Sequence, residues 1–380
     1  MNPFPLQVLG LGAVTPLGLS APSTCAALRA QLSAYAASSG LFHQSFDPGL
    51  GGALEPITLA LLPDTLASPD IDEPSRLLQA AAGAVEEALM QSGQAARDCA
   101  LIVGTREPQR EHPDFDGFGQ RWIEGIEELL GLRFHAASSV IARGHASAFA
   151  GVRTAQHLLR DGRVAACIVG GVDSLCNVYD LERYVLAYRV LGDTVSKGFV
   201  PGEGAAFVAV GEPHIGRDAA IPVHLAGVGL ASEDPRHCLL SDGQPTGRGL
   251  ERALNDAVAD SGIAESRIDL RLSDLNGESF RIDEMLLATI RFYKTYRKHL
   301  EFWHPAGGVG DMGAASGAML MVQGCTALMQ GLAPGAVAMC ESASDTTDRA
   351  ACVLARSSDG AGRSSRGRSP PADGYAGPRS

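Results

Sequence analysis

The sequence lacks the features that would place it in a membrane or on a nucleic acid. No stretch of about 18 apolar residues is free of charges and helix breakers, so no membrane span is expected. The segment 1–12 has no basic residues ahead of an apolar run, which argues against a secretory signal and favours the cytoplasm. With 31 basic and 43 acidic residues, the formal charge of −12 disfavours nonspecific nucleic-acid binding.

The sequence also lacks the usual marks of a disulfide framework or a metal centre. Its eight cysteines are scattered without a C-x-x-C pair. Several of them, such as Cys167 and Cys352, lie in apolar runs, as buried free thiols of a reducing compartment do. A loop with His112, Asp114 and Asp116 has metal-binding residue types, but we interpret it as a solvated acidic loop. We therefore expect no bound metal.

No cofactor motif is complete. Gly10 and Gly12 resemble the start of a nucleotide-binding glycine loop. The third glycine of that motif is missing, and Thr15 and Pro16 follow instead. We therefore expect no bound cofactor.

The 380 residues alternate short apolar runs with helical stretches, which is typical of an α/β protein with a large core. From about residue 357 the chain is dominated by Ser, Gly, Pro and Arg, a composition that predicts disorder. Apolar runs predict strands at 6–11, 99–104, 138–142, 164–170, 205–210, 222–230, 270–275, 335–339 and 351–355. Helical periodicity predicts helices at 24–32, 74–92, 146–161, 248–261, 282–296 and 313–330.

Five segments together carry a family resemblance. They are LGLGAVTPLG (9–18), LLRDGRVAACIVGGVDSL (158–175), GFVPGEGAAFVAV (198–210), VHLAGVGLASED (223–234) and GDMGAASG (310–317). In this order and spacing they resemble the β-ketoacyl synthase (3-oxoacyl-carrier-protein synthase) branch of the thiolase superfamily, from about residue 6 to 355. The resemblance implies a thiolase-like α/β fold, with duplicated halves in a five-layered α-β-α-β-α sandwich. We expect the halves at 1–215 and 216–356, with the tail at 357–380.

The positions where that family keeps its catalytic Cys-His-His set hold other residues. The cysteine position at the start of a buried helix matches His145, and the two histidine positions match Glu278 and Asp311. Carboxylates only accept hydrogen bonds at neutral pH, so they would repel the oxyanion that the family's histidines stabilise. The family's lysine is replaced by Ala306, and its Gly-Phe-Gly-Gly loop by the segment 341–351. The favoured interpretation is an inactive site, with no catalytic residue assigned.

Two catalytic alternatives stay open. If the family geometry holds, His145, Glu278 and Asp311 meet, and a histidine with two carboxylates can serve acid/base catalysis or weak metal binding. Ser147, two residues after the lost cysteine, is a substitute nucleophile. Either alternative would make the chain an acyltransferase or hydrolase with non-standard residues.

The resemblance also suggests partners. It implies a homodimer, or a heterodimer with a ketosynthase-like paralogue, formed through the edge strand at 138–142. The leading hypothesis is a non-catalytic subunit, similar to a chain-length factor of fatty acid or polyketide biosynthesis. A second precedent is an accessory role beside a secreted protein. The basic and aromatic run 291–299 could dock an acyl carrier protein, although a solvated helix end with inward-packed Phe292, Tyr293 or Tyr296 is the simpler reading.

Overall fold

The computed structural model describes residues 3–44, 54–63, 65–66, 72–110, 119–213 and 221–357. The predicted disordered tail and the loop with His112, Asp114 and Asp116 lie outside the described residues. No helix of the described residues is long and apolar enough to cross a membrane.

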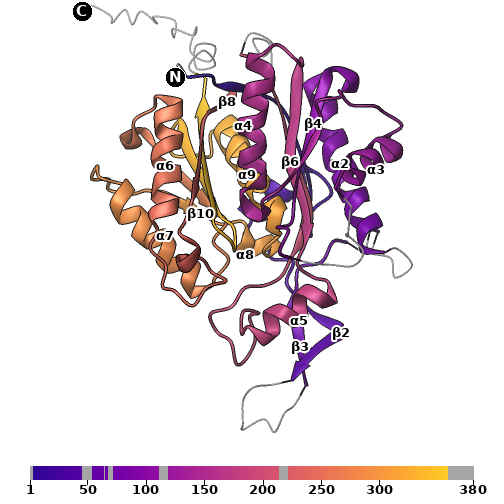
Figure 1. Cartoon of the computed structure of the whole chain (residues 1–380), viewed down its shortest axis with the longest axis vertical. Helices are drawn as coiled ribbons and strands as arrows, with labels where there is room; N and C mark the ends of the chain where they lie inside the picture. The colour runs from indigo at the N-terminus through magenta and orange to yellow at the C-terminus, as the bar shows by residue number, and fades with distance from the viewer. Residues whose placement is uncertain are drawn as a thin grey trace, which may run out of the picture.

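Two halves of the chain repeat one strand topology, which bears out the predicted duplication (Figure 1). Each half contains five strands that lie side by side. Counted from the strand at the centre of the sheet outward, the first two strand pairs are antiparallel and the next two pairs are parallel. Residues 6 and 7 pair with 225 and 224 and join the halves into one ten-stranded sheet. The first half runs β1 (Leu6–Val14), β7 (Glu203–Gly211), β6 (Ala166–Ser174), β4 (Cys99–Thr105) and β5 (Ser139–Ala142). The second half runs β8 (Val223–Ser232), β12 (Asp348–Arg356), β11 (Val337–Ala343), β9 (Leu270–Ser273) and β10 (Glu301–Trp303).

The two halves of the sheet form the two β layers of the predicted sandwich, and helices form the other three layers (Figure 1). On one outer face α2 (Glu73–Ser92) packs on β1 and β7 and carries α3 (Arg121–Leu130). On the other, α6 (Arg248–Ser261) packs on β8 and β12 and carries α7 (Ser279–Phe292). The central layer holds α4 (Ser147–Arg160) and α9 (Ser316–Gln330), each of which contacts strands of both halves. Helix α1 (Ala21–Arg29) packs against β1 and α9.

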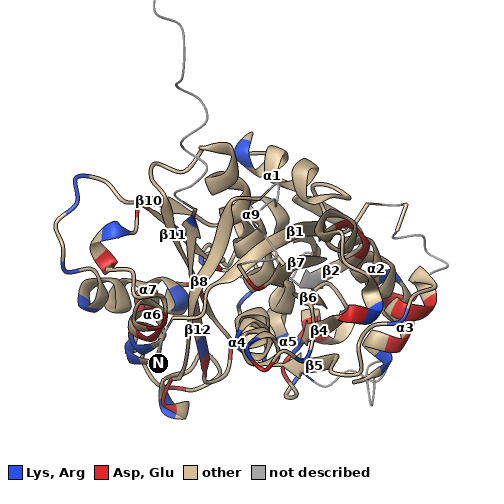
Figure 2. Ribbon diagram, turned by 90° about the horizontal axis from the view of Figure 1, so that it is seen from above, with Lys and Arg blue, Asp and Glu red and all other residues tan. Residues whose placement is uncertain are grey.

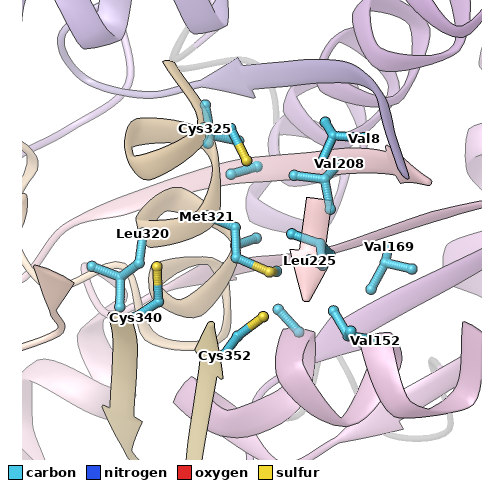
Figure 3. Close-up of a cluster of buried hydrophobic side chains, with 14 of the residues drawn as sticks. Val8, Val152, Val169, Val208, Leu225, Leu320, Met321, Cys325, Cys340 and Cys352 are labelled. Carbon is cyan, nitrogen blue, oxygen red and sulfur yellow. The ribbon is translucent and has the colours of Figure 1, made fainter. Parts of the chain in front are cut away.

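The buried apolar side chains divide in the same way. The largest cluster fills the central layer, where Cys325, Cys340 and Cys352 lie among Val, Leu and Met side chains (Figure 3). A second cluster lies between α2, α3 and the first half of the sheet, and a third between α6, α7 and the second half. Apolar burial therefore stabilises each interface between layers.

Glycines in the first strand of each half allow the outer helix to lie close. A Cβ on Gly12 would come within 1.9 Å of the carbonyl oxygen of Ala84 in α2, and a Cβ on Gly229 within 1.9 Å of that of Ala253 in α6. The Gly10–Gly12 pair is thus required for strand–helix packing. This explains a glycine pattern that resembles a nucleotide loop.

Besides a single-turn helix, four parts of the fold were not predicted: one hairpin, one edge strand and two helices. The hairpin of β2 (Ala36–Gln44) and β3 (Leu54–Leu59) and helix α5 (Val178–Leu186) form a small unit that projects below the sandwich (Figure 1). Edge strand β10 and helix α3 complete the four. The short helix α8 (Ala306–Val309) lies just before the GDMG turn. The predicted helix 282–296 is shifted, because α7 begins at Ser279 and ends at Phe292, which leaves most of the basic run in a loop.

Candidate functional site

Two equivalent turns of the duplicated fold bring His145 and Asp311 together. Each of the helices α4 and α9 is preceded by a 3-10 turn, Gly144–Ala146 in the first half and Gly313–Ala315 in the second. His145 lies in the first turn, and Asp311 lies two residues before the second. The His145 Nε2 and Asp311 Oδ1 atoms are 2.7 Å apart, and both side chains are buried. Two of the three residues predicted to meet are thus in direct contact.

Glu278 joins this pair indirectly. The Nδ2 group of Asn276 donates to Glu278 Oε2 at 2.9 Å and to Asp311 Oδ2 at 2.8 Å. Glu278 itself is buried at the start of α7. The Asn276 amide therefore bridges two carboxylates.

A buried arginine, Arg281, and a partly buried one, Arg189, neutralise the carboxylates. Arg189 Nε and Nη2 donate to Glu278 at 2.7 and 3.0 Å, and its Nη1 and Nη2 donate to Asp345 at 2.8 and 3.2 Å. Arg281 Nη2 donates to Asp345 at 2.6 Å, and its guanidinium lies 3.7 Å from Asp274. Fork-like donation to two carboxylates fixes each side chain in one geometry. We use the name charge cluster for the following residues: His145, Arg189, Asp274, Asn276, Glu278, Arg281, Asp311 and Asp345.

The segment that replaces the family's glycine loop closes over the cluster. Ser342 Oγ donates to the carbonyl oxygen of His145 at 2.8 Å, and Asp345 supplies the carboxylate shared by the two arginines. The sequence showed only that the glycine loop is lost. Arg189 and Asp345 gave no local signal, because they lie 89 and 67 residues from Glu278 along the chain.

Electrostatics make His145 a cation at neutral pH. Burial alone would lower the pKa of His145, but the Asp311 carboxylate outweighs burial and raises it to about 9. Burial likewise opposes ionisation of Asp311, yet the charge and hydrogen bond of His145 hold its pKa well below the ordinary range. A protonated imidazole has no free lone pair. His145 is therefore neither a nucleophile nor a general base at pH 7.

Glu107 is a further buried acid beside His145 that the sequence did not reveal. Its Oε1 lies 4.0 Å from His145 Nδ1, and neither atom has a hydrogen-bond partner. Burial and the charge of Asp345 raise the pKa of Glu107, while His145 and Arg110 counteract the rise. Gly144 leaves room for this carboxyl group, since a Cβ there would come within 2.0 Å of Glu107 Oε1.

The other candidate nucleophiles are occupied or protonated. Ser147 is fully buried at the start of α4, where its Oγ accepts from Arg143 N at 2.9 Å and donates to Thr105 O at 3.2 Å. All eight cysteines are buried and free. Burial raises the pKa of Cys25 to about 11 and those of Cys99 and Cys167 to about 12, so these thiols stay protonated.

One small cavity borders the charge cluster. The cavity lined by Asp274 and Arg281 has a volume of about 10 Å³, room for about one water molecule. Among the described residues, no group of three His, Cys, Asp or Glu side chains is placed to hold a metal ion. The cluster is therefore a dense set of ion pairs and hydrogen bonds.

The basic run 291–299 lies apart, at the end of α7 and in the loop that leads to β10 (Figure 2). Phe292 is buried and Tyr293 partly buried, but Tyr296 is 90% exposed. The prediction of inward packing thus holds for the first two aromatic residues only. Arg297 is held by Glu265 at 2.7 Å.

Comparisons with known proteins place this fold. No family model matches the chain, and no curated protein matches it. Among solved structures, the ishigamide ketosynthase/chain length factor is similar over 93% of this chain and 99% of its own, at 17% identity and a TM-score of 0.74. A type II polyketide acyl-carrier protein in complex with its ketosynthase matches over 93% and 100%, at 16% identity and a TM-score of 0.74.

A third structure belongs to a modular enzyme. The ketosynthase from module 6 of the bacillaene synthase of Bacillus subtilis 168 matches over 93% of this chain and 72% of its own, at 15% identity and a TM-score of 0.72. At these identities the likeness concerns the fold alone. The predicted thiolase-type ketosynthase fold is confirmed.

Proposed function

We propose that this ketosynthase-fold chain is a non-catalytic subunit that pairs with a ketosynthase-like partner, as a chain-length factor does. The observation that carries the proposal is the charge cluster. It holds His145, Glu278 and Asp311, which the sequence resemblance matches to the family's catalytic positions, in hydrogen bonds and ion pairs. At neutral pH a site of this kind offers no nucleophile, because His145 is protonated and paired with Asp311.

A partner is supported by the edge of the sheet. Strand β5 pairs with β4 on one side and ends the sheet on the other. Its Val140 and Ile141 are only partly buried, whereas every residue of β4 is buried. An edge strand with half-covered apolar side chains and free backbone groups can extend a sheet across a two-fold axis. The partner is either a second copy or a ketosynthase-like paralogue that retains the cysteine.

Affinity purification of the full chain from its native cell, followed by mass spectrometry, tests the proposal. We expect a ketosynthase-fold partner, or a second copy shown by a dimer mass in light scattering. Ala142 is exposed at the end of β5, so Ala142→Glu should abolish pairing without unfolding the chain, while the control Ala142→Ser should keep it. A monomeric wild-type chain that captures no ketosynthase-fold protein would overturn the proposal.

A further inference from the structure

A second feature lies away from the charge cluster: a half-open cavity of about 420 Å³. It lies between α1, the end of α9, and the chain from β10 into α8. None of the charge-cluster residues lines it. Cavities of a few hundred Å³ with mixed polar and apolar walls are typical of small-molecule sites.

The walls of this cavity are fixed by close packing. Helices α1 and α9 meet at Cys25 and Thr326, where the Cys25 thiol donates to Thr326 Oγ1 at 3.6 Å. Opposite them, Gly308 approaches α1 so closely that a Cβ there would lie 2.7 Å from Leu28 Cδ2 and 2.9 Å from the carbonyl oxygen of Leu32. The space is thus preformed, which lowers the free-energy cost of filling it.

Apolar and polar side chains share the lining. Leu28, Leu32 and Trp303 contribute apolar surface. Gln323 also lines the cavity, and its Oε1 is buried without a hydrogen-bond partner. Because a terminal amide rotates over a broad range, this group can turn either a donor or an acceptor toward a ligand.

The charge at the cavity is positive. Arg29 lines it in the last turn of α1, is exposed, and has no ion-pair partner among the residues that the structure describes. The backbone carbonyl groups at the C-terminal end of α1 do not fully cancel the charge of Arg29, because they already accept hydrogen bonds from backbone amides. Residue 26 accepts from residue 30, residue 27 from residue 32, and residue 28 from residue 31. An anionic head on an apolar body would therefore match the cavity.

We infer that this cavity binds an apolar carboxylate, with the carboxylate at Arg29 and the apolar body between α1, Trp303 and α9. The chemistry is shared by a flexible aliphatic acid and a flat aromatic acid. Phe302 and His304, whose ring centroids are 5.9 Å apart, extend the aromatic wall beside Trp303. Both kinds of acid are therefore needed as probes.

Isothermal titration of the full chain with decanoate and with 2-naphthylacetate tests the inference. We expect saturable binding of one molecule of at least one acid, and at least tenfold weaker binding of the matched alcohols decanol and 2-naphthaleneethanol. Binding should change the emission of Trp303, which is one of only two tryptophans; the other, Trp122, is buried in α3. The change should disappear in Trp303→Phe.

Two arginine variants test whether the charge of Arg29 is needed for binding. Arg29→Gln should weaken binding about tenfold, because a charged hydrogen bond is lost. Arg97 is exposed and does not line the cavity, so Arg97→Gln should leave binding unchanged. No saturable binding of either acid up to about 1 mM would overturn the inference. So would alcohols that bind as tightly as the acids, or equal affinities of the two arginine variants.

Discussion

Asp311→Asn gives the most informative single perturbation, because it keeps the shape of the side chain while it removes the charge and turns one acceptor oxygen into an amide donor. In the wild type, the Asp311 carboxylate overcomes the effect of burial and raises the pKa of His145 from 6.5 to about 9. That change corresponds to about 3 kcal/mol of stabilisation by the charged pair. Removing one partner of a buried pair costs on the order of 3–5 kcal/mol. Asp311→Asn should therefore lower the free energy of unfolding by several kcal/mol at slightly acid pH.

The pH dependence gives this prediction its sign. When folding raises the pKa of a group, that group stabilises the folded state. The stabilisation has its full size at pH values below the pKa in the unfolded chain, and it is lost as the pH rises through the pKa in the folded protein. The wild type should thus lose about 3 kcal/mol from this pair between pH about 6 and about 9. In Asp311→Asn, burial and Arg281 keep His145 neutral, so the loss should not occur. The stability gap between the two proteins should narrow by about that amount at the higher pH.

Urea unfolding followed by circular dichroism at both pH values measures that gap. Asp98→Asn, at an exposed carboxylate outside the cluster, is the matched control and should lie within about 0.5 kcal/mol of the wild type at both pH values. An Asp311→Asn protein as stable as the wild type would refute the account of the pair. A gap of equal size at both pH values would refute the assignment of a charged His145.

The remaining predictions concern packing, the arginines and the thiols. Arg189→Met should cost about 3–5 kcal/mol in urea unfolding, because Glu278 and Asp345 both lose their fork-like donor; a cost below about 1 kcal/mol would contradict the ion-pair geometry. Gly10→Ala should cost at least about 1–3 kcal/mol, because its Cβ would lie 2.1 Å from Ala88 O, whereas Gly40→Ala, where nothing lies within 4 Å, should change stability little. Iodoacetamide should modify the eight buried cysteines slowly in the native protein and completely in urea, as counted by intact mass. Rapid native labelling of Cys167 would contradict its burial and raised pKa.

Much of the fold was predictable because local signals and tertiary packing agree. Strand β4 was predicted within one residue, and α6 was predicted at its observed bounds. The apolar periodicity of these elements matches the faces they bury. Helix α2 also has clear end signals, with Asp72 accepting from Ser75 N and Gly93 in the left-handed conformation.

The missed elements have weaker local signals. Strand β10 is three residues long and forms part of the sheet only through β9. Strand β3 alternates between exposed and buried positions, but an apolar Leu54 is exposed and a charged Glu55 is buried, so residue type does not follow the pattern of a half-buried strand. One available signal was overlooked: the Gly-x-Gly pairs of β1 and β8 repeat at equivalent positions, at 10–12 and 227–229, and mark the duplication.

The candidate site was predictable in part. The family framework predicted that His145, Glu278 and Asp311 meet. In the structure His145 contacts Asp311, and Glu278 is linked to Asp311 through Asn276. The arginines were not predictable, because Arg189 reaches the cluster from the loop after α5 and Arg281 from α7. Their pairing depends on long-range packing rather than on local sequence.

The central claim is that the charge cluster has replaced the reactive machinery of a ketosynthase fold. It is tested most directly by the intact mass of the full chain after incubation with malonyl- and acyl-loaded carrier protein. The account predicts an unchanged mass, because His145 is protonated and Ser147 and the thiols are buried. A stable mass increase equal to the acyl group, absent from Ser147→Ala or from a cysteine variant, would contradict it.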